Sequence, residues 1–140
     1  MQTLHLARPT LWSVDAPALH RLVTEVVSRG RVTDRVETPF GIRTIRFDAD
    51  HGFFLNGKRV ELQGTCNHQE HAGVGAALPD RLQEYRIAKL KEMGSNAYRT
   101  SHNPPTPELL DACDRLGMLV LDETRMFSPE PEGLGQLERM

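Results

Sequence analysis

The chain has 140 residues, of which 39% are hydrophobic and 26% are charged, and its formal net charge is −2. These values are typical of a globular protein and give no electrostatic reason to expect nucleic acid or an anionic membrane as partner. No apolar run approaches the roughly 20 residues that span a bilayer, and the first residues do not resemble a signal peptide. We therefore expect a soluble protein of unknown location.

The first 48 residues show the alternation of a half-buried β-sheet. Apolar and polar residues alternate in residues 22–27 and 42–47, and residues 31–37 continue the pattern after a turn. A period of two is typical of strands. Pro39-Phe40-Gly41 predicts a break between strands. An immunoglobulin-like sandwich needs about seven strands in ~100 residues, so this segment predicts only its last strands.

Residues 49–140 predict alternating strands and helices. Asn56-Gly57 lies between two apolar runs and indicates a hairpin, because both central residues of a type I′ turn need positive φ. We expect the second arm to continue as a strand through Cys66. Capping signals predict one helix from Asp80 to Gly94 and another from Thr106 to Gly117.

Two further strands are predicted at residues 96–100 and 118–121, and the apolar second one is expected to be buried on both faces. The order β-α-β-α-β implies parallel strands with right-handed crossovers. One helix face is expected to pack in the core: Leu82, Tyr85, Ile87, Leu90 and Met93. Cys66 and Cys113 are expected to be two buried thiols rather than a disulfide or a metal site.

Together these elements predict an incomplete fragment of a larger fold. Residues 1–48 are expected to be the C-terminal strands of an immunoglobulin-like β-sandwich. Residues 49–140 are expected to be the first β/α units of a (β/α)₈ TIM barrel, which takes roughly 250 residues in full. Residues 131–140 resemble the start of a further helix. A self-contained small α+β protein is the alternative.

Polar side chains follow each predicted parallel strand. They are Asn67, His68, Glu70 and His71 after the first, Arg99, Ser101, His102 and Asn103 in and after the second, and Asp122 and Glu123 after the third. The carboxyl ends of parallel strands lie at one edge of a sheet, where ligands bind. The sequence therefore predicts a binding site at this edge.

Each of these groups also has an alternative role. Arg99 lies in an apolar strand and could pair with Glu123 or Asp122 as a structural ion pair. His102 could hydrogen-bond the following Pro-Pro turn. His68 and His71 are three residues apart, and this spacing only weakly indicates a metal site.

Several segments together resemble glycoside hydrolase family 2, and they cover nearly the whole chain. They are residues 11–13 and 19–22, residues 40–43 and 53–58, residues 64–71, residues 96–105, and residues 113–123. The resemblance implies a retaining exo-β-glycosidase without a cofactor, acting on β-galactosides first and on β-glucuronides or β-mannosides next. Residues 69–75 differ from the best-known bacterial β-galactosidases, which leaves the sugar open.

The resemblance also implies roles for individual residues. His68, Arg99 and His102 would bind the sugar, with Arg99 near the catalytic nucleophile, and no metal would be bound. Asn103, Asp122 and Glu123 would support them. The partner would be a β-linked oligosaccharide or glycoside, and the full-length protein could form a homo-oligomer.

Retaining glycosidases need two carboxyl groups about 5–5.5 Å apart. The resemblance implies two glutamates after later barrel strands, the first in an Asn-Glu pair, and no Asn-Glu pair occurs in this sequence. We therefore expect no catalytic residue in this chain and no hydrolysis by it alone. Two other functions stay open: a metal-dependent barrel hydrolase with His68, His102 and Glu123 as ligands, and a non-catalytic carbohydrate-binding module.

Overall fold

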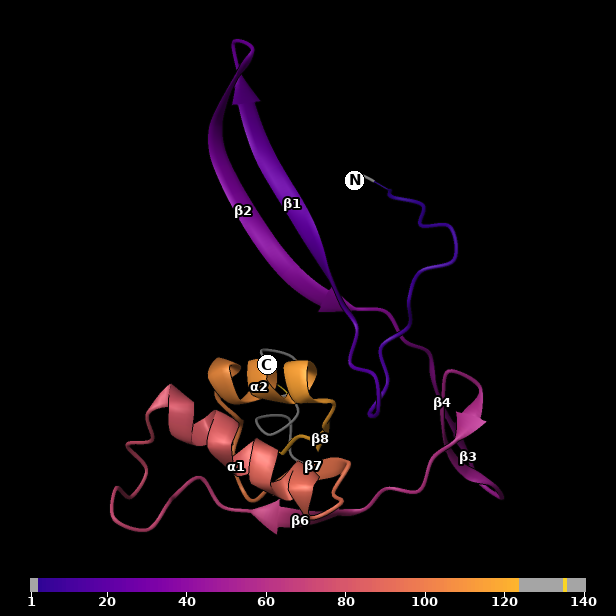
Figure 1. Cartoon of the computed structure of the whole chain (residues 1–140), viewed down its shortest axis with the longest axis vertical. Coiled ribbons are helices and arrows are strands. Elements are labelled where there is room, and N and C mark those ends of the chain that lie inside the picture. Colours follow the sequence, from indigo (N-terminus) through magenta and orange to yellow (C-terminus); the bar gives the residue numbers. More distant parts are fainter. Residues whose placement is uncertain (1–2, 124–134, 136–140) are drawn as a thin grey trace. The chain divides into compact units, whose positions relative to one another are not determined.

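The computed structural model describes residues 3–123 and Gly135, and the chain forms two compact units. The N-terminal unit comprises residues 1–60 and the C-terminal unit residues 61–140. Within the described residues the N-terminal unit contains strands, whereas the C-terminal unit contains strands and helices (Figure 1). The predicted helix at residues 131–140 lies outside the described residues apart from Gly135.

The N-terminal unit contains two antiparallel sheets. Strands β1 (Leu19–Ser28) and β2 (Arg31–Gly41) form a long hairpin, seen as a curved ribbon in Figure 1. The predicted break at Pro39 is wrong, because Pro39 lies inside β2 opposite Arg21. Both strands of a two-stranded sheet are edge strands, where a residue without an N–H group is tolerated. Gly41 ends β2 beside Trp12, and a Cβ there would lie 3.1 Å from the Trp12 side chain.

A second sheet is formed by β3 (Ile45–Asp48), β4 (Gly52–Leu55) and β5 (Lys58–Arg59). The predicted strand at residues 42–47 begins only at Ile45, because the Ile42 carbonyl accepts a hydrogen bond from Trp12 instead. The predicted hairpin is confirmed.

The turn of this hairpin has the expected backbone. Asn56 has φ 51° and Gly57 has φ 78°, both positive as a type I′ turn requires. The second arm ends at Arg59, so the predicted continuous strand to Cys66 is wrong. The Asn96 side chain binds the backbone of Glu61 and Gln63, each at 2.8 Å, and so directs the chain into another sheet.

The C-terminal unit has the predicted β-α-β-α-β order. Its elements are β6 (Gly64–Asn67), α1 (Asp80–Glu92), β7 (Ala97–Thr100), α2 (Pro107–Leu116) and β8 (Leu119–Leu121). The sheet order is β6-β7-β8 and both pairs are parallel, as predicted. Thr106 caps α2 by accepting a hydrogen bond from Leu109 N at 3.3 Å, and Gly117 ends it with φ 75°.

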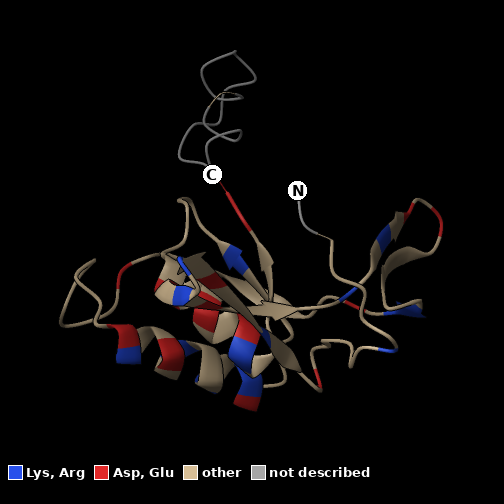
Figure 2. Cartoon of the chain, turned by 90° about the horizontal axis from the view of Figure 1, so that it is seen from above, with Lys and Arg blue, Asp and Glu red and all other residues tan. Residues whose placement is uncertain are grey.

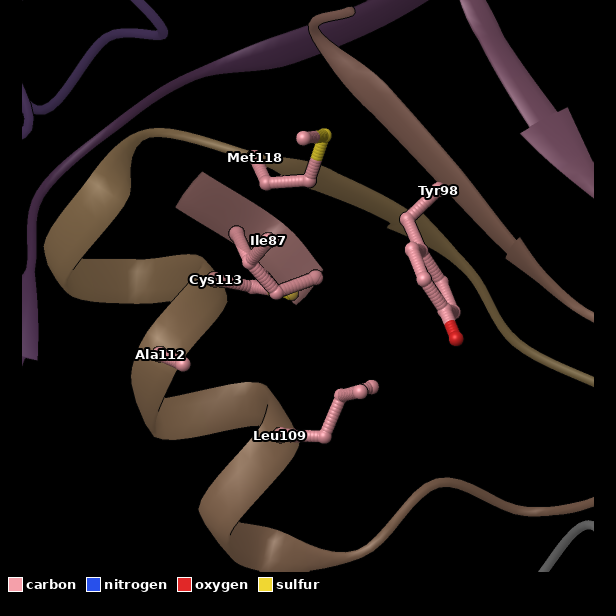
Figure 3. Close-up of a cluster of buried hydrophobic side chains, with 6 residues drawn as sticks. All are labelled: Ile87, Tyr98, Leu109, Ala112, Cys113 and Met118. Carbon is pink, nitrogen blue, oxygen red and sulfur yellow. The ribbon is translucent and has the colours of Figure 1, made fainter. Parts of the chain in front are cut away.

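Helices α1 and α2 pack on one face of this sheet and enclose its core. Figure 3 shows the buried side chains Ile87, Tyr98, Leu109, Ala112, Cys113 and Met118 gathered between the helices and the strands. The predicted helix face is only partly correct, because Tyr85 and Met93 are 53% and 75% exposed. At about 100° per residue, Tyr85 lies on the opposite side of α1 from Ile87, and Met93 is the C-cap.

The other face of the sheet is exposed, and we call Cys66, Arg99 and Leu121 the open face. These three residues are register partners in β6, β7 and β8. Leu121 is 44% exposed, so the prediction that β8 is buried on both faces is wrong. Cys66 is also exposed, against expectation, while Cys113 is buried and burial raises its pKa to about 12. In the described residues, only one face of the sheet is covered by helices.

Basic and acidic residues are interspersed along the helices, as the blue and red segments of the ribbon in Figure 2 show. The residues of α1 include Asp80 and Glu84 as well as Arg81 and Lys89. None of the described helices is long and apolar enough to cross a membrane.

Candidate functional site

Glu123 holds two of the predicted site residues together. Its Oε2 atom lies 2.7 Å from His102 Nδ1, and its Oε1 atom forms an ion pair with Arg99 Nη2. The Glu123 side chain is only 16% exposed, whereas Arg99 and His102 are 44% and 45% exposed. An ionised carboxylate only accepts hydrogen bonds, so His102 Nδ1 carries the hydrogen. One carboxylate thus fixes two side chains that remain open to solvent.

The electrostatics of this site favour the ionised forms of Glu123 and Arg99. The hydrogen bond from His102 lowers the pKa of Glu123, and Arg99 lowers that pKa further. The hydrogen bond to Cys66 raises the pKa of Arg99, and Glu123 raises it further. The guanidinium Nη1 lies 3.3 Å from Cys66 Sγ. The ion pair predicted for Arg99 is therefore present with Glu123, and the guanidinium still reaches the surface of the open face.

Thr100, which the sequence did not single out, anchors the backbone of this site. Its Oγ1 accepts a hydrogen bond from Glu123 N at 2.9 Å and lies 3.4 Å from Asp122 Oδ1. Thr100 is 2% exposed. Its place at the end of β7, one residue after Arg99, is the signal that could have identified it. Ser101 is buried as well, so it lies beneath the site rather than in it.

His68 lies beside His102 in the structure. Their ring centroids are 5.8 Å apart with an edge-on angle of 86°. Its Nδ1 atom is 3.9 Å from Glu70, and its backbone carbonyl accepts a hydrogen bond from Arg86 at 2.7 Å. Residues from the ends of β6, β7 and β8 therefore meet at one edge of the sheet, where ligands bind in parallel α/β folds.

The other predicted residues have smaller parts in this arrangement. Asn103 donates a hydrogen bond from its side chain to the Pro104 carbonyl at 2.7 Å, which shapes the turn after His102. His71 forms a backbone bridge with Gly75 inside the loop after β6. Among the described residues, no group of three His, Cys, Asp or Glu side chains is placed to hold a metal ion.

A cavity of about 310 Å³ adjoins the loops that carry His68 and His102. Asn67 and Gln69, on either side of His68, contribute to its lining, as does Asn103 next to His102. Arg86 and Tyr98 line the side that belongs to α1 and β7. The cavity is therefore on the helix-covered side of the sheet, and the open face is on the other.

Comparison with known proteins identifies the family. Residues 48–136 match the TIM barrel domain of glycosyl hydrolases family 2, and residues 1–43 match a second model described as glycosyl hydrolases family 2. The chain belongs to glycoside hydrolase family 2. The family predicted from the sequence is confirmed.

Relatives in this family carry two kinds of name. A β-galactosidase from Bacteroides ovatus is 48% identical over 87% of this chain and 14% of its own length. A β-glucuronidase from Bacteroides fragilis is 35% identical over 90% of this chain and 18% of its own length. The crystal structure of a β-glycosidase from Bacteroides vulgatus matches with a TM-score of 0.82 and 39% identity, over 91% of this chain and 16% of that one. The chain spans less than a fifth of each of these proteins.

Proposed function

We propose that this chain supplies one wall of the sugar-binding site of a retaining exo-β-glycosidase whose substrates are terminal β-galactosides. Residues 1–48 would belong to an immunoglobulin-like domain and residues 49–140 to the start of the TIM barrel. The observation that carries the proposal is the bridge of Glu123 to Arg99 and His102, with His68 beside them. Such a group at the strand ends suits a ligand with many hydroxyl groups.

In this proposal His68, Arg99 and His102 bind the sugar. A guanidinium has five N–H donors in a fixed fork, and an imidazole can donate or accept, so these groups match sugar hydroxyls. Asn103, Asp122 and Glu123 hold them in place. Glu123 does so by charge, Asp122 by its contact with Thr100, and Asn103 by its hydrogen bond to the Pro104 carbonyl.

Glu123 is not suited to be the acid or the nucleophile of such an enzyme. Both of its oxygens are bound by cationic or hydrogen-bonding partners, and its pKa is lowered. A general acid needs a raised pKa, and a retaining enzyme needs a second carboxyl group about 5–5.5 Å away. We therefore propose that both catalytic glutamates come from other parts of a longer protein, which we call the full-length enzyme.

A second candidate substrate is a β-glucuronide. It is favoured by relatives such as a putative β-glucuronidase from Formosa agariphila, which is 40% identical over 86% of this chain. The two sugars differ at two carbons: galactosides carry a hydroxymethyl group where glucuronides carry a carboxylate at C6, and the hydroxyl group at C4 has the opposite configuration. A comparison of matched substrates separates them.

The test uses the full-length enzyme and nitrophenyl β-galactoside, β-glucuronide and β-mannoside. The expected result is the highest kcat/KM for the galactoside, with the β configuration retained in the first product seen by NMR. Highest kcat/KM for the glucuronide would replace the proposed substrate, and an inverted product or no turnover would contradict the proposed mechanism. The 140-residue chain serves as control and should show no turnover of these substrates.

A further inference from the structure

Arg86 connects the helix layer to the loop that carries His68. It lies in α1, next to Ile87, which is fully buried in the core. Its Nη2 atom donates a 2.7 Å hydrogen bond to the His68 carbonyl. Arg86 does not belong to the open face, yet it contacts the backbone of a residue at the candidate sugar site.

The loop after β6 has few features that would hold His68 by themselves. Gly73 and Gly75 adopt positive φ values of 88° and 61°, and glycine has more conformational freedom than any other residue. The hydrogen bonds between His71 and Gly75 close the loop on itself. A bond from a cationic donor is about twice as strong as a neutral one. Arg86 therefore ties a loop with much freedom to a helix fixed by the core.

The surroundings of Arg86 leave room for the loop to move if this bond is lost. Arg86 borders the cavity of about 310 Å³ and is the one charged residue among the described residues that line it. Asn67 and Gln69, the neighbours of His68, line the same space. Without the guanidinium, the segment around His68 could shift into this cavity, and the ring would move away from His102.

We propose that Arg86 is a positioning residue that sets the place of His68 in the sugar site. The inference rests on the proposed function, because it gives His68 the task of binding the sugar. Arg86 acts only through the backbone of His68 and does not touch the substrate. The charge of the guanidinium strengthens its hydrogen bond to the His68 carbonyl, and the length of the side chain reaches it, so neither a neutral nor a shorter side chain replaces it fully.

The test compares Arg86→Met, Arg86→Lys and Arg86→Ala in the full-length enzyme. Arg86→Met keeps most of the unbranched aliphatic part of the side chain and removes every donor, so kcat/KM should fall by about tenfold to a hundredfold, the effect of displacing a substrate-binding group by up to ~1 Å. Arg86→Lys should recover part of the loss. Millimolar guanidinium should raise the activity of Arg86→Ala, because the truncation leaves a space beside the existing cavity.

The matched control is Arg81→Met, a change of an exposed arginine in the same helix, which should leave kcat/KM within about twofold of the wild type. Wild-type kcat/KM for Arg86→Met would overturn the inference. So would a loss that neither lysine nor guanidinium relieves, because a purely structural arginine would behave in that way. An inactive wild-type enzyme contradicts the proposed function, whereas an active enzyme that tolerates Arg86→Met contradicts only this inference.

Discussion

Tyr98 and Arg99 are neighbours in β7, yet they lie on opposite faces of the sheet. Tyr98 is 2% exposed and packs with α1 and α2, and burial raises the pKa of its hydroxyl group. Arg99 is on the open face with Cys66 and Leu121 and is bound by Glu123. Successive side chains of a strand point to opposite faces.

The difference between the two faces separates stability from function. The covered face carries the apolar cluster around Ile87 and Tyr98, so substitutions in that cluster should destabilise the C-terminal unit. The open face and its edge carry the half-exposed side chains Arg99 and His102, so substitutions of these residues should change sugar binding and leave the fold intact. Each of the following predictions tests one side of this comparison.

The largest effect on stability is expected for Ile87→Ala on the covered side. Ile87 of α1 is fully buried in the core cluster with residues of β7 and α2. Its truncation therefore leaves a cavity and should lower the free energy of unfolding by about 2–5 kcal/mol. Denaturant unfolding of the chain measures this. Met93→Ala, at a position 75% exposed, is the control and should change the free energy of unfolding by about 0.5 kcal/mol or less. Equal effects of the two changes would contradict the assignment of the core.

Glu123→Gln tests the edge of the open face. The amide cannot form the ion pair with Arg99, so both Arg99 and His102 lose their fixed positions, and kcat/KM of the full-length enzyme should fall by about tenfold to a hundredfold. The thermal midpoint should change little, because Arg99 and His102 are 44% and 45% exposed and solvent weakens their interaction with Glu123. Glu84→Gln is the control, since Glu84 pairs with Arg115 on the exposed side of the helices. Unchanged kcat/KM in Glu123→Gln would remove the support for a positioning role.

A smaller effect is expected for Thr106→Ala at the start of α2. The Thr106 hydroxyl accepts a hydrogen bond from Leu109 N, and loss of such a cap costs about 1 kcal/mol. Thr106→Ser keeps the acceptor and should recover most of the stability. Chemical unfolding of both variants measures the difference. An alanine variant as stable as the serine variant would show that the cap does not stabilise α2.

The last prediction concerns the effect of pH on the wild-type protein through protonation of Glu123, an effect that is smallest at neutral pH. The pKa of Glu123 is lowered in the folded chain. Ionised Glu123 therefore stabilises the folded state fully above the ordinary glutamate pKa of about 4.3, and this stabilisation is lost as the pH falls through the lowered pKa. The contribution of Glu123 to sugar binding should therefore be constant from neutral pH down to mildly acidic pH and decline only below it. Glu123→Gln should lack this acid-side decline. A decline of equal size in Glu123→Gln would assign it to another group.

Much of the fold could be predicted from local signals. Thr106 and Gly117 mark the ends of α2, and the alternation of β7 with two helices predicts parallel strands, because these signals lie within a few residues of one another. The strand through Cys66 was predicted wrongly because Asn96, some thirty residues later, holds the backbone of Gln63. A contact between distant residues leaves no pattern in the local sequence.

In the candidate site, too, the features set by local sequence could be predicted and the contacts between distant residues could not. His68, Arg99, His102 and Glu123 could be placed at one edge from their positions after parallel strands, and the structure brings them together. Their role in sugar binding stays a prediction. Thr100 and Arg86 were not singled out, because each acts through a backbone group of another segment. A threonine or an arginine in a sequence does not indicate which distant backbone group it will bind.

The central claim is that Arg99 on the open face serves sugar binding rather than folding. The most direct test measures kcat/KM and the thermal midpoint of Arg99→Ala in the full-length enzyme, beside Arg81→Ala as control. The kcat/KM of Arg99→Ala should fall by about a hundredfold or more, and its thermal midpoint should stay within a few degrees of the wild type. Activity near that of the wild type, or a loss matched by unfolding, would contradict this claim.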